Sequence, residues 1–504
     1  MEMPANDAFI VSRMNKMVFT MAIALLATLP LWSSKIYYRD DLYRVLNGST
    51  ETWLTNGRPA TWIMQSILSF GQSVSDISPL NLIIGLLALS IASVVFTERL
   101  QIRLDGYWAL IPPLFIVLNP FLTQVMLYSY DSLTMLVSIS CAMMASQIEG
   151  TRRYKSITCC VLLLLLVQTL YQSGLNIYIA CIALIIFFRV YHHQPVWQWL
   201  MSKVAALLIG VLAYKLFISY LLPVKMDWYT LKHFRLLPLN LESLAVIQTS
   251  IKRYSEFFLN AYPAAALVFV VLPIVIALIS TLIISFKIRS EQRHARSGKW
   301  LLLPAFFIAV LAVPGLSLAL AMPLFAPRML MAWSITLLFC FYVGTLAFPR
   351  GIKLLAGSSL ILLCYHLVLM LVCFNTVVND QRYQMSVMNQ IKMDFSSFPA
   401  QTIDSVAFIG QLNDAPDVRI NIRNFPIINH IRMKMLGESE PWIWQAMMWQ
   451  VNLSLKTVEA SDEMRMIKPR EYHSQGPDYD AFKDNNVLVI DFRKSGGVVT
   501  KYIQ

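Results

Sequence analysis

The stretch Lys35–Pro59 concentrates charged side chains that are scarce in the rest of this chain: KIYYRDDLYRVLNGSTETWLTNGRP. It holds two adjacent carboxylates, Asp40 and Asp41, and guanidinium groups that include Arg44 and Arg58. A carboxylate can take a proton from a reacting hydroxyl as a general base. An arginine can bind phosphate through several N–H donors at once. The stretch therefore indicates proton transfer and anion binding at one place.

The spacing within this stretch suggests how its charges pair. If residues 39–44 form a helical turn, Arg44 follows Asp40 by four residues and Asp41 by three, so it can pair with either. Neighbouring side chains on a helix point about 100° apart, so only one of the two acids can readily face a substrate. The alternative is a solvated loop whose surface ion pairs contribute at most about 1 kcal/mol. The scarcity of charge outside the connections favours a functional site.

Three further motifs carry candidate site residues. Tyr130 and Asp131 begin an apolar segment, where the acid could bind a substrate or simply cap a helix and interact with its dipole. Tyr171 and Gln172 lie in a tight turn, where they could contact a hydroxylated ligand or anchor the turn. Arg328 stands in a short connection and could bind phosphate, although a snorkelling arginine at the membrane surface is the alternative.

The composition indicates a polytopic membrane protein. The chain has 504 residues, of which 57% are hydrophobic and 14% are charged, where a soluble domain carries about 25% charged residues. The net charge of +12 comes from Lys and Arg in short connections rather than from a continuous basic stripe, so we expect no nucleic acid partner. The seven cysteines lie in or at the ends of apolar segments and have no disulfide or zinc spacing.

A membrane-spanning helix needs about 20 apolar residues, and we expect an all-α membrane part with about eleven spans. Lys and Arg gather in every second connection, which places the N-terminus in the cytoplasm. With an odd number of spans, the Asp40/Asp41 loop and the C-terminus face outward. Pro112 and Pro113 predict a broken helix that must be buried or face a cavity. The expected spans lie near residues 17–34, 80–97, 107–119, 131–148, 157–171, 175–190, 204–222, 262–286, 300–320, 329–348 and 354–374.

The composition becomes mixed and polar after residue 374, which predicts two domains. Residues 1–374 form the transmembrane domain with an outward loop at 35–79, and residues 375–504 form a small α/β domain. Within the second domain, residues 405–409 and 486–492 read as strands and 441–455 as a helix. Residues 377–394 read as a helix that continues out of the last span.

The order of these motifs resembles the bacterial type II O-antigen glucosyltransferases, which change serotype by decorating lipopolysaccharide and look like members of the C-type glycosyltransferase superfamily. The resemblance covers roughly residues 35–330. Ser129 departs from it, because a basic residue is expected before the Tyr-Asp pair. The matching motifs are the acid pair with Arg44, Gly48, Trp53 and Gly57-Arg58-Pro59, then Asn119-Pro120-Phe121 through Tyr130-Asp131-Ser132, then Tyr171-Gln172 and Pro327-Arg328.

The resemblance implies an inverting transfer of glucose from undecaprenyl-phosphate glucose to a hydroxyl of the O-antigen. The reaction would take place on the periplasmic face of the bacterial inner membrane, where the C-terminal domain would help to bind the acceptor polysaccharide. No cofactor is required, although a divalent metal bridging carboxylate and phosphate is compatible with the chemistry. In this reading Asp40 or Asp41 is the catalytic base, Arg44, Arg58 and Arg328 bind the donor phosphate, and Asp131, Tyr130, Tyr171 and Gln172 contact the substrates.

Other functions place similar residues in a membrane protein. A flippase or transporter of lipid-linked sugars would also have charges in a membrane cavity. Such proteins often show internal repeats with matched broken helices, and this sequence has no second half that resembles the first. A transferase of another polyprenyl-phosphate sugar, or an O-antigen polymerase, would share the fold. A structural assembly factor is disfavoured by the acid pair.

Overall fold

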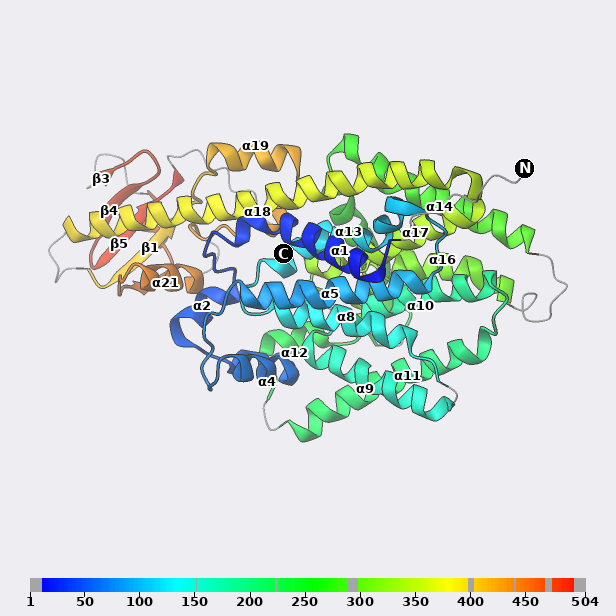
Figure 1. Cartoon of the computed structure of the whole chain (residues 1–504). Helices are drawn as coiled ribbons and strands as arrows, with labels where there is room; N and C mark the ends of the chain where they lie inside the picture. Colours follow the sequence, from blue (N-terminus) through cyan, green and yellow to red (C-terminus); the bar gives the residue numbers. More distant parts are fainter. Residues whose placement is uncertain are drawn as a thin grey trace.

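The computed structural model describes residues 11–150, 152–222, 225–238, 240–288, 298–397, 403–438, 441–466 and 474–493. Most of these residues are helical. The helices gather into one bundle, and a small sheet lies beyond one end of it (Figure 1). The expected combination of a helical membrane part and a C-terminal α/β region is therefore present.

Seven helices in the described residues are long and apolar enough to cross a membrane, or eight if one bent pair counts as a span. All eleven expected segments fall on helices, but the count of about eleven is too high by this measure. The physical reason is length, because α1 (Arg13–Ala27), α8 (Ser132–Gln147) and α16 (Leu302–Leu311) are each shorter than the shortest of the seven, which has 18 residues. Four of the seven are helices extended by an adjoining turn: α11 (Trp197–Leu216) to Tyr220, α14 (Val268–Lys287) from Ala264, α17 (Trp333–Ala347) from Pro327 and α18 (Ile352–Ser397) from Pro349. The others are α5 (Leu80–Arg99), α9 (Arg153–Leu170) and α10 (Gly174–Tyr191).

The bent pair confirms a broken helix in this span, but the break lies between Val117 and Pro120, because Pro112 and Pro113 stand in the first turn of α6 (Ile111–Val117), where proline is tolerated. Helix α6 ends before Asn119, and α7 (Thr123–Met126) continues after a short 3-10 turn, with a bend of 42°. The side chain of Asn119 bridges this break, because its Nδ2 donates to the carbonyl of Met331 at 2.8 Å and its Oδ1 accepts from the N–H of Phe121 at 3.1 Å. Both helices are buried within the bundle, as irregular backbone at membrane depth requires.

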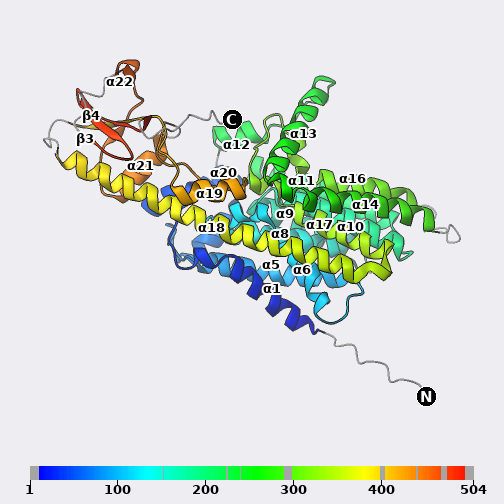
Figure 2. The same cartoon turned by 90° about the horizontal axis from the view of Figure 1, so that it is seen from above.

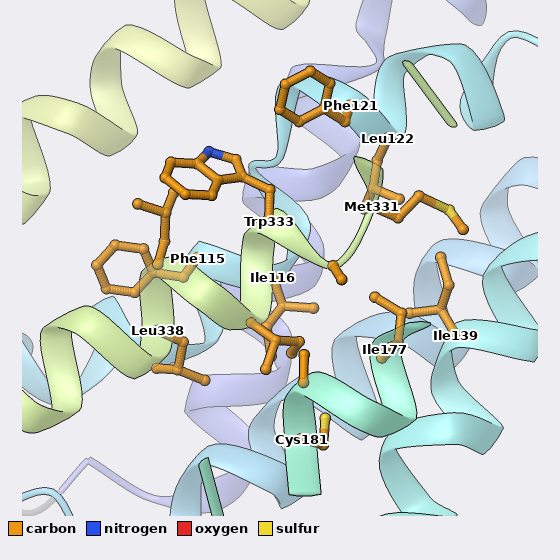
Figure 3. Packing of buried hydrophobic residues seen from close by; sticks show 14 of the residues in the cluster. Phe115, Ile116, Phe121, Leu122, Ile139, Ile177, Cys181, Met331, Trp333 and Leu338 are labelled. Atoms are coloured by element: carbon orange, nitrogen blue, oxygen red, sulfur yellow. The ribbon is translucent and has the colours of Figure 1, made fainter. Parts of the chain in front are cut away.

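The centre of the bundle is a close-packed apolar core around α6, α10 and α17 (Figure 3). Phe115 from α6, Leu338 from α17 and Cys181 from α10 all belong to this core, and Ile177 of α10 lies beside Ile139 of α8. Helices α10 and α17 are buried on nearly every side, whereas α11 and α14 expose apolar residues over much of their length. This pattern is expected where inner helices contact protein and outer helices contact lipid.

Helix α18 joins the bundle to the sheet. Its 46 residues would measure about 69 Å at the rise of an α-helix, and it runs along the bundle and then past its end to the sheet (Figures 1 and 2). The predicted continuation of the last span over 377–394 is thus confirmed. Val387, Met388 and Ile391 from its outer half lie in a second apolar core with Phe408 and Trp444.

The C-terminal sheet has five strands in the order β2-β1-β5-β4-β3. Strand β1 (Ser405–Ile409) pairs in parallel with β2 (Lys456–Thr457) and β5 (Val487–Asp491). Strands β4 (Asp480–Asp484) and β3 (Ser474–Gln475) continue the sheet in antiparallel fashion. The helices of this region are α19 (Pro416–Asn424), α20 (Ile428–Ile431), α21 (Pro441–Gln450) and α22 (Asp462–Met466).

The predicted strands and helix of this region are confirmed, with one difference in length. Helix α21 ends at Gln450 rather than at residue 455. Asn452 has a φ of 56°, a left-handed conformation that commonly follows the end of a helix. The chain therefore turns away before it enters β2.

Three short helices form the loop at 35–79 between the first two long apolar segments. They are α2 (Asp40–Asn47), α3 (Glu51–Thr55) and α4 (Pro59–Leu68). Helix α2 lies at the end of the bundle near α21 (Figure 1), and its Leu42 is fully buried in the second apolar core. The loop is therefore held between the bundle and the C-terminal region. A further connection contains α12 (Trp228–Phe234) and α13 (Glu242–Asn260).

Candidate active site

The acid pair lies in the first turn of α2, as the spacing predicts. Arg39 precedes the helix with a φ of 49°, and Asp40 is its first residue. Negative side chains are favourable at this end because the helix dipole is positive there. Gly48 ends the helix with a φ of 63°, the left-handed conformation that glycine adopts without strain. Arg44 lies within ion-pair distance of Asp40 at 3.9 Å and of Asp41 at 3.7 Å.

Asp41 is fully buried and joins two distant segments. Its Oδ2 accepts a hydrogen bond from the N–H of Ser129 at 2.7 Å and a longer one from the N–H of Tyr38 at 3.4 Å. Its Oδ1 is buried and has no hydrogen-bond partner among the residues described. Burial raises the pKa of the Asp41 carboxyl well above its usual value, and the charge of Asp131 adds to this effect against the opposing charge of Arg44. Asp41 therefore favours its neutral form.

Asp40 has the opposite environment. Its side chain is 56% exposed, and the ion pair with Arg44 is long. The two neighbouring acids point in different directions from the helix, as the spacing predicts, so that Asp40 is exposed and Asp41 is buried. Asp40 is thus the acid that an external hydroxyl can approach.

Asp131 holds the loop onto the bundle. It accepts hydrogen bonds from Arg44 Nη1 at 2.5 Å, Trp53 Nε1 at 2.8 Å and Arg58 Nη1 at 3.4 Å. The guanidinium of Arg44 also lies over the Trp53 ring, 4.6 Å from its centre. Asp131 precedes α8, but its side chain makes no capping hydrogen bond there. Asp131 is thus the N-cap residue of α8, where its charge is favourable to the helix dipole, but the predicted capping hydrogen bond is wrong, because Arg44, Trp53 and Arg58 of the loop occupy both carboxylate oxygens.

Arg44 and Arg58 differ in how far they are available. Arg44 is 2% exposed, whereas Arg58 is 18% exposed and lies 4.8 Å from the centre of the Tyr171 ring. The Nε atoms of both arginines are buried and have no hydrogen-bond partner in the described part of the chain, so the difference between them lies in exposure and in the short ion pair of Arg44 with Asp131. Arg58 therefore keeps donors that an anion could use, while Arg44 is committed to Asp131.

Gln172 shapes the backbone beside Arg58. Its Nε2 donates to the carbonyls of Asn56 at 3.1 Å and Gly57 at 3.4 Å, and to the hydroxyl of Tyr214 at 2.9 Å. Gly57 has a φ of 69°, and an added Cβ there would lie 2.6 Å from the Tyr214 hydroxyl. The amide nitrogen of Gln172 thus donates its hydrogen bonds to groups of the protein itself. The predicted contact between Gln172 and a substrate stays a prediction.

Tyr130 is buried on the other side of Asp131. It packs with Trp53 and Val74 in a small apolar cluster, and its carbonyl accepts a hydrogen bond from Gln65 Nε2 at 2.6 Å. Gln65 on α4 is buried as well. Sequence reasoning gave Gln65 no role, since a glutamine in a short apolar helix carries no distinctive signal. These contacts fix the segment that carries Asp131.

Arg328 reaches the same place from the 3-10 turn Pro327–Leu330 that precedes α17. Its side chain donates a hydrogen bond to the hydroxyl of Tyr128, and its main-chain N–H donates to Gln124 Oε1 at 3.0 Å. The charged groups that act on its guanidinium are Arg39, Asp40 and Arg58. The structure therefore brings together residues from four connections that are far apart in the sequence.

Arg39 is a member of this cluster to which we had assigned no role. The only sequence signal was its place directly before the acid pair. Together the cluster has more guanidinium groups than carboxylates, and burial favours the neutral form of one acid, so its net charge is positive and suits an anion. Its members are Arg39, Arg44, Arg58, Arg328, Asp40, Asp41 and Asp131.

A metal centre is not apparent in the residues that the structure describes. No group of three or more His, Cys, Asp or Glu side chains lies close enough together there to hold an ion. The seven cysteines, all described, are unpaired. The donors around Asp41 and Asp131 are N–H groups of the protein itself.

Known proteins resemble this chain over the part that carries the cluster. The family model described as Glucosyl transferase GtrII matches residues 29–341, which include every member of the cluster. A protein of Salmonella phage P22, described as an uncharacterized 55.3 kDa protein in the gtrB 5' region, is 28% identical over 261 residues. This match covers 51% of the chain and 52% of the phage protein, so the chain spans about half the length of that relative. No solved structure matches.

Proposed function

Because the chain belongs to the GtrII glucosyl transferase family, we propose that it transfers glucose from a polyprenyl-phosphate donor to a hydroxyl of the O-antigen. The observation that carries the proposal is the contrast between the two neighbouring acids. Asp40 is open beside an excess of guanidinium groups, and Asp41 is buried. An exposed carboxylate next to an anion-binding surface is the minimum that such a transfer needs.

In the proposed reaction, Asp40 takes the proton of the acceptor hydroxyl as its oxygen attacks the anomeric carbon of glucose. The bond between that carbon and the phosphate oxygen breaks, and the electron pair leaves with the polyprenyl phosphate. A single displacement of this kind inverts the configuration at the anomeric carbon. The step needs one base and no nucleotide, cofactor or metal.

Arg58 and Arg328 bind the donor phosphate and stabilise the charge that develops on it. Arg39 joins them, because its positive charge, like the negative charge of Asp40, influences the guanidinium of Arg328. Arg39 therefore belongs to the same cluster of charges. Arg44, which the sequence also assigned to the phosphate, is buried and donates to Asp131. In the proposal, Arg44 therefore positions the loop rather than touching the donor.

A lipid-linked donor fits the place of the cluster. The cluster lies at one end of the helical bundle, next to connections between helices rather than at their midpoints. A polyprenyl chain can remain in the bilayer while its phosphate and sugar reach the headgroup level. A transporter would instead hold its charged site near the middle of the membrane.

The direct test measures transfer by the purified full chain in lipid nanodiscs. The substrates are synthetic polyprenyl-phosphate glucose and O-antigen that lacks glucose. Asp40→Asn should lower kcat by at least about 100-fold, the typical contribution of a general base. Glu51→Gln is the matched control, because Glu51 is an exposed acid in the same loop, and it should retain activity. Full transfer by Asp40→Asn would refute the assignment of the base.

The proposed side of the membrane has its own test. The excess of Lys and Arg in every second connection predicts that the C-terminal region lies in the periplasm of a bacterial cell. A reporter that is active only outside the cytoplasm, fused after Gln504, should be active. Activity of a cytoplasmic reporter at the same position would refute the orientation. Movement of the donor across vesicles without transfer of glucose would favour a flippase.

A further inference from the structure

An open groove of about 420 Å³ lies beside the candidate active site, between the membrane bundle and the C-terminal region. One wall is the segment Lys35–Tyr37, which leads into α2. The opposite wall is the outer half of α18, and Gln450 at the end of α21 completes the groove. Three parts of the chain that are distant in sequence therefore build it.

The side chains along the groove combine two cations, Lys35 and Arg382, with uncharged hydrogen-bonding groups. Lys35 lies 3.7 Å from the carboxylate of Asp76, and Arg382 donates to the hydroxyl of Ser34 at 2.7 Å. The uncharged groups suit a hydroxylated ligand. Gln381, Asn389 and Gln450 contribute amides, Ser386 contributes a hydroxyl and Tyr37 a phenol. An amide offers both hydrogen-bond donors and an acceptor, as a sugar hydroxyl does. No carboxylate lines the groove among the described residues. Sites with several fixed polar groups on a partly apolar surface are typical of small-molecule and oligosaccharide binding.

One of these amides lacks a partner. The Nε2 of Gln450 is buried and makes no hydrogen bond within the described structure. Buried polar groups in proteins almost always have a partner. Asn389, by comparison, donates only to the carbonyl of Met385 in its own helix, at 3.0 Å, and its side chain is exposed. The groove therefore has donors that a ligand can take up.

The groove is joined directly to the acid pair. Gln381 Nε2 donates to the carbonyl of Tyr37 at 3.3 Å, so the groove wall is tied to α18. The carbonyl of the preceding residue, Ile36, accepts a hydrogen bond from the hydroxyl of Ser129. The N–H of the same serine donates to the carboxylate of Asp41. Tyr37 precedes Asp40 by three residues, which span at most about 11 Å of chain. A ligand chain that fills the groove thus ends close to the reacting groups.

We propose that this groove binds the acceptor polysaccharide at sugar residues next to the one that receives glucose. The inference rests on the proposed function, and it assigns the acceptor a path along the outer half of α18. The ligand is an oligosaccharide whose hydroxyls form hydrogen bonds with the amide and hydroxyl side chains of the groove. The lipid donor approaches from the bundle, and the polysaccharide approaches from the groove.

The test uses two neighbouring amide side chains of α18. Asn389 lines the groove, whereas Gln390 is exposed and lies outside it. Asn389→Trp should fill the groove, and Gln390→Trp is the matched control, because it places the same bulky ring on the next residue of the same helix. The full chain in nanodiscs is titrated with polysaccharide released from lipopolysaccharide that lacks glucose, in the absence of donor. Asn389→Trp should bind at least about tenfold more weakly, which corresponds to the loss of one or two hydrogen bonds.

Gln450→Leu supplies a second readout that separates binding from folding. The Nε2 of Gln450 has no partner in the described structure, so its removal should not lower the unfolding midpoint, while polysaccharide binding weakens. Equal binding by Asn389→Trp and Gln390→Trp would overturn the proposal, as would a wild-type chain that binds no polysaccharide. Because the titration contains no donor, this result is independent of whether glucose is transferred. With active protein, the KM for a multi-repeat acceptor should rise in Asn389→Trp while the donor KM stays constant.

Discussion

Asp131→Asn is the substitution that most directly tests how the active-site loop is held. The carboxylate of Asp131 accepts hydrogen bonds from Arg44, Trp53 and Arg58, and both it and Arg44 are almost completely buried. Asparagine has nearly the same volume, so the change removes charge without leaving a cavity. Its carbonyl can still accept from Trp53. The expected loss therefore comes from the unpaired guanidinium of Arg44.

The magnitude follows from the burial of this pair. Removing one partner of a buried ion pair costs about 3–5 kcal/mol, because the other charge is left without compensation. Asp41 lies 3.7 Å from Arg44 and can become charged to replace part of the lost interaction. We therefore expect a loss near the lower end, about 3 kcal/mol. Asp41→Asn combined with Asp131→Asn removes this replacement, so the double variant should lose more than the sum of the two single variants.

The assay is denaturant unfolding of the purified chain in detergent micelles. Glu256→Gln is the control, because Glu256 pairs with Lys252 at 3.9 Å and both side chains are mostly exposed. Exposed pairs of this kind contribute less than about 1 kcal/mol. If Asp131→Asn unfolds at the same denaturant concentration as Glu256→Gln, the loop is not held by this ion pair and the reasoning fails.

Three further predictions concern backbone, protonation and phosphate binding. Gly57→Ala should destabilise the fold by at least about 1–2 kcal/mol, because the φ of Gly57 is 69° and an added Cβ would meet Tyr214. Gly357 has open space around it, so Gly357→Ala is the control and should not destabilise the fold. Equal unfolding midpoints for the two variants would contradict the prediction. Burial raises the pKa of Asp41, so its neutral form stabilises the fold below about pH 3.9, and this contribution is lost as pH rises through the raised pKa. Asp41→Asn should therefore flatten that part of the pH dependence of unfolding, and an unaltered profile would show that Asp41 is charged in the fold. Arg328→Lys keeps the positive charge but loses the planar guanidinium, which can donate several hydrogen bonds to one phosphate. The donor KM should therefore rise roughly tenfold, while the acceptor KM stays unchanged. An unchanged donor KM would remove Arg328 from the phosphate site.

The spacing of the acid pair led to a local geometry that the structure reproduces. Arg44 follows Asp40 by four residues and Asp41 by three, and both ion pairs are present. Such pairs depend only on the geometry of one helical turn, which is why they can be predicted from sequence. The sequence predicts the broken helix in the right span but not at the right place, because Pro112 and Pro113 lie in the first turn of α6 and the bend follows Val117.

The role of Asp131 could not be predicted in the same way. In the sequence it precedes an apolar helix, and a capping role explains such an acid equally well. Its actual partners, Arg44 and Arg58, come from a loop more than seventy residues earlier in the chain. Contacts over such separations depend on how the helices pack, and a local pattern contains no information about them.

By itself, the sequence determined that this chain has a largely helical membrane part, a separate C-terminal α/β region and an acid pair next to arginines. These features follow from hydropathy, composition and short spacing, which act along the chain. Only the tertiary structure decided that Asp41 is buried and Asp40 is exposed. That difference arises because the N–H of Ser129 binds Asp41 and because Leu42 is buried against the C-terminal region. Burial depends on neighbours that are distant in sequence, so folding rather than residue type separates the two acids.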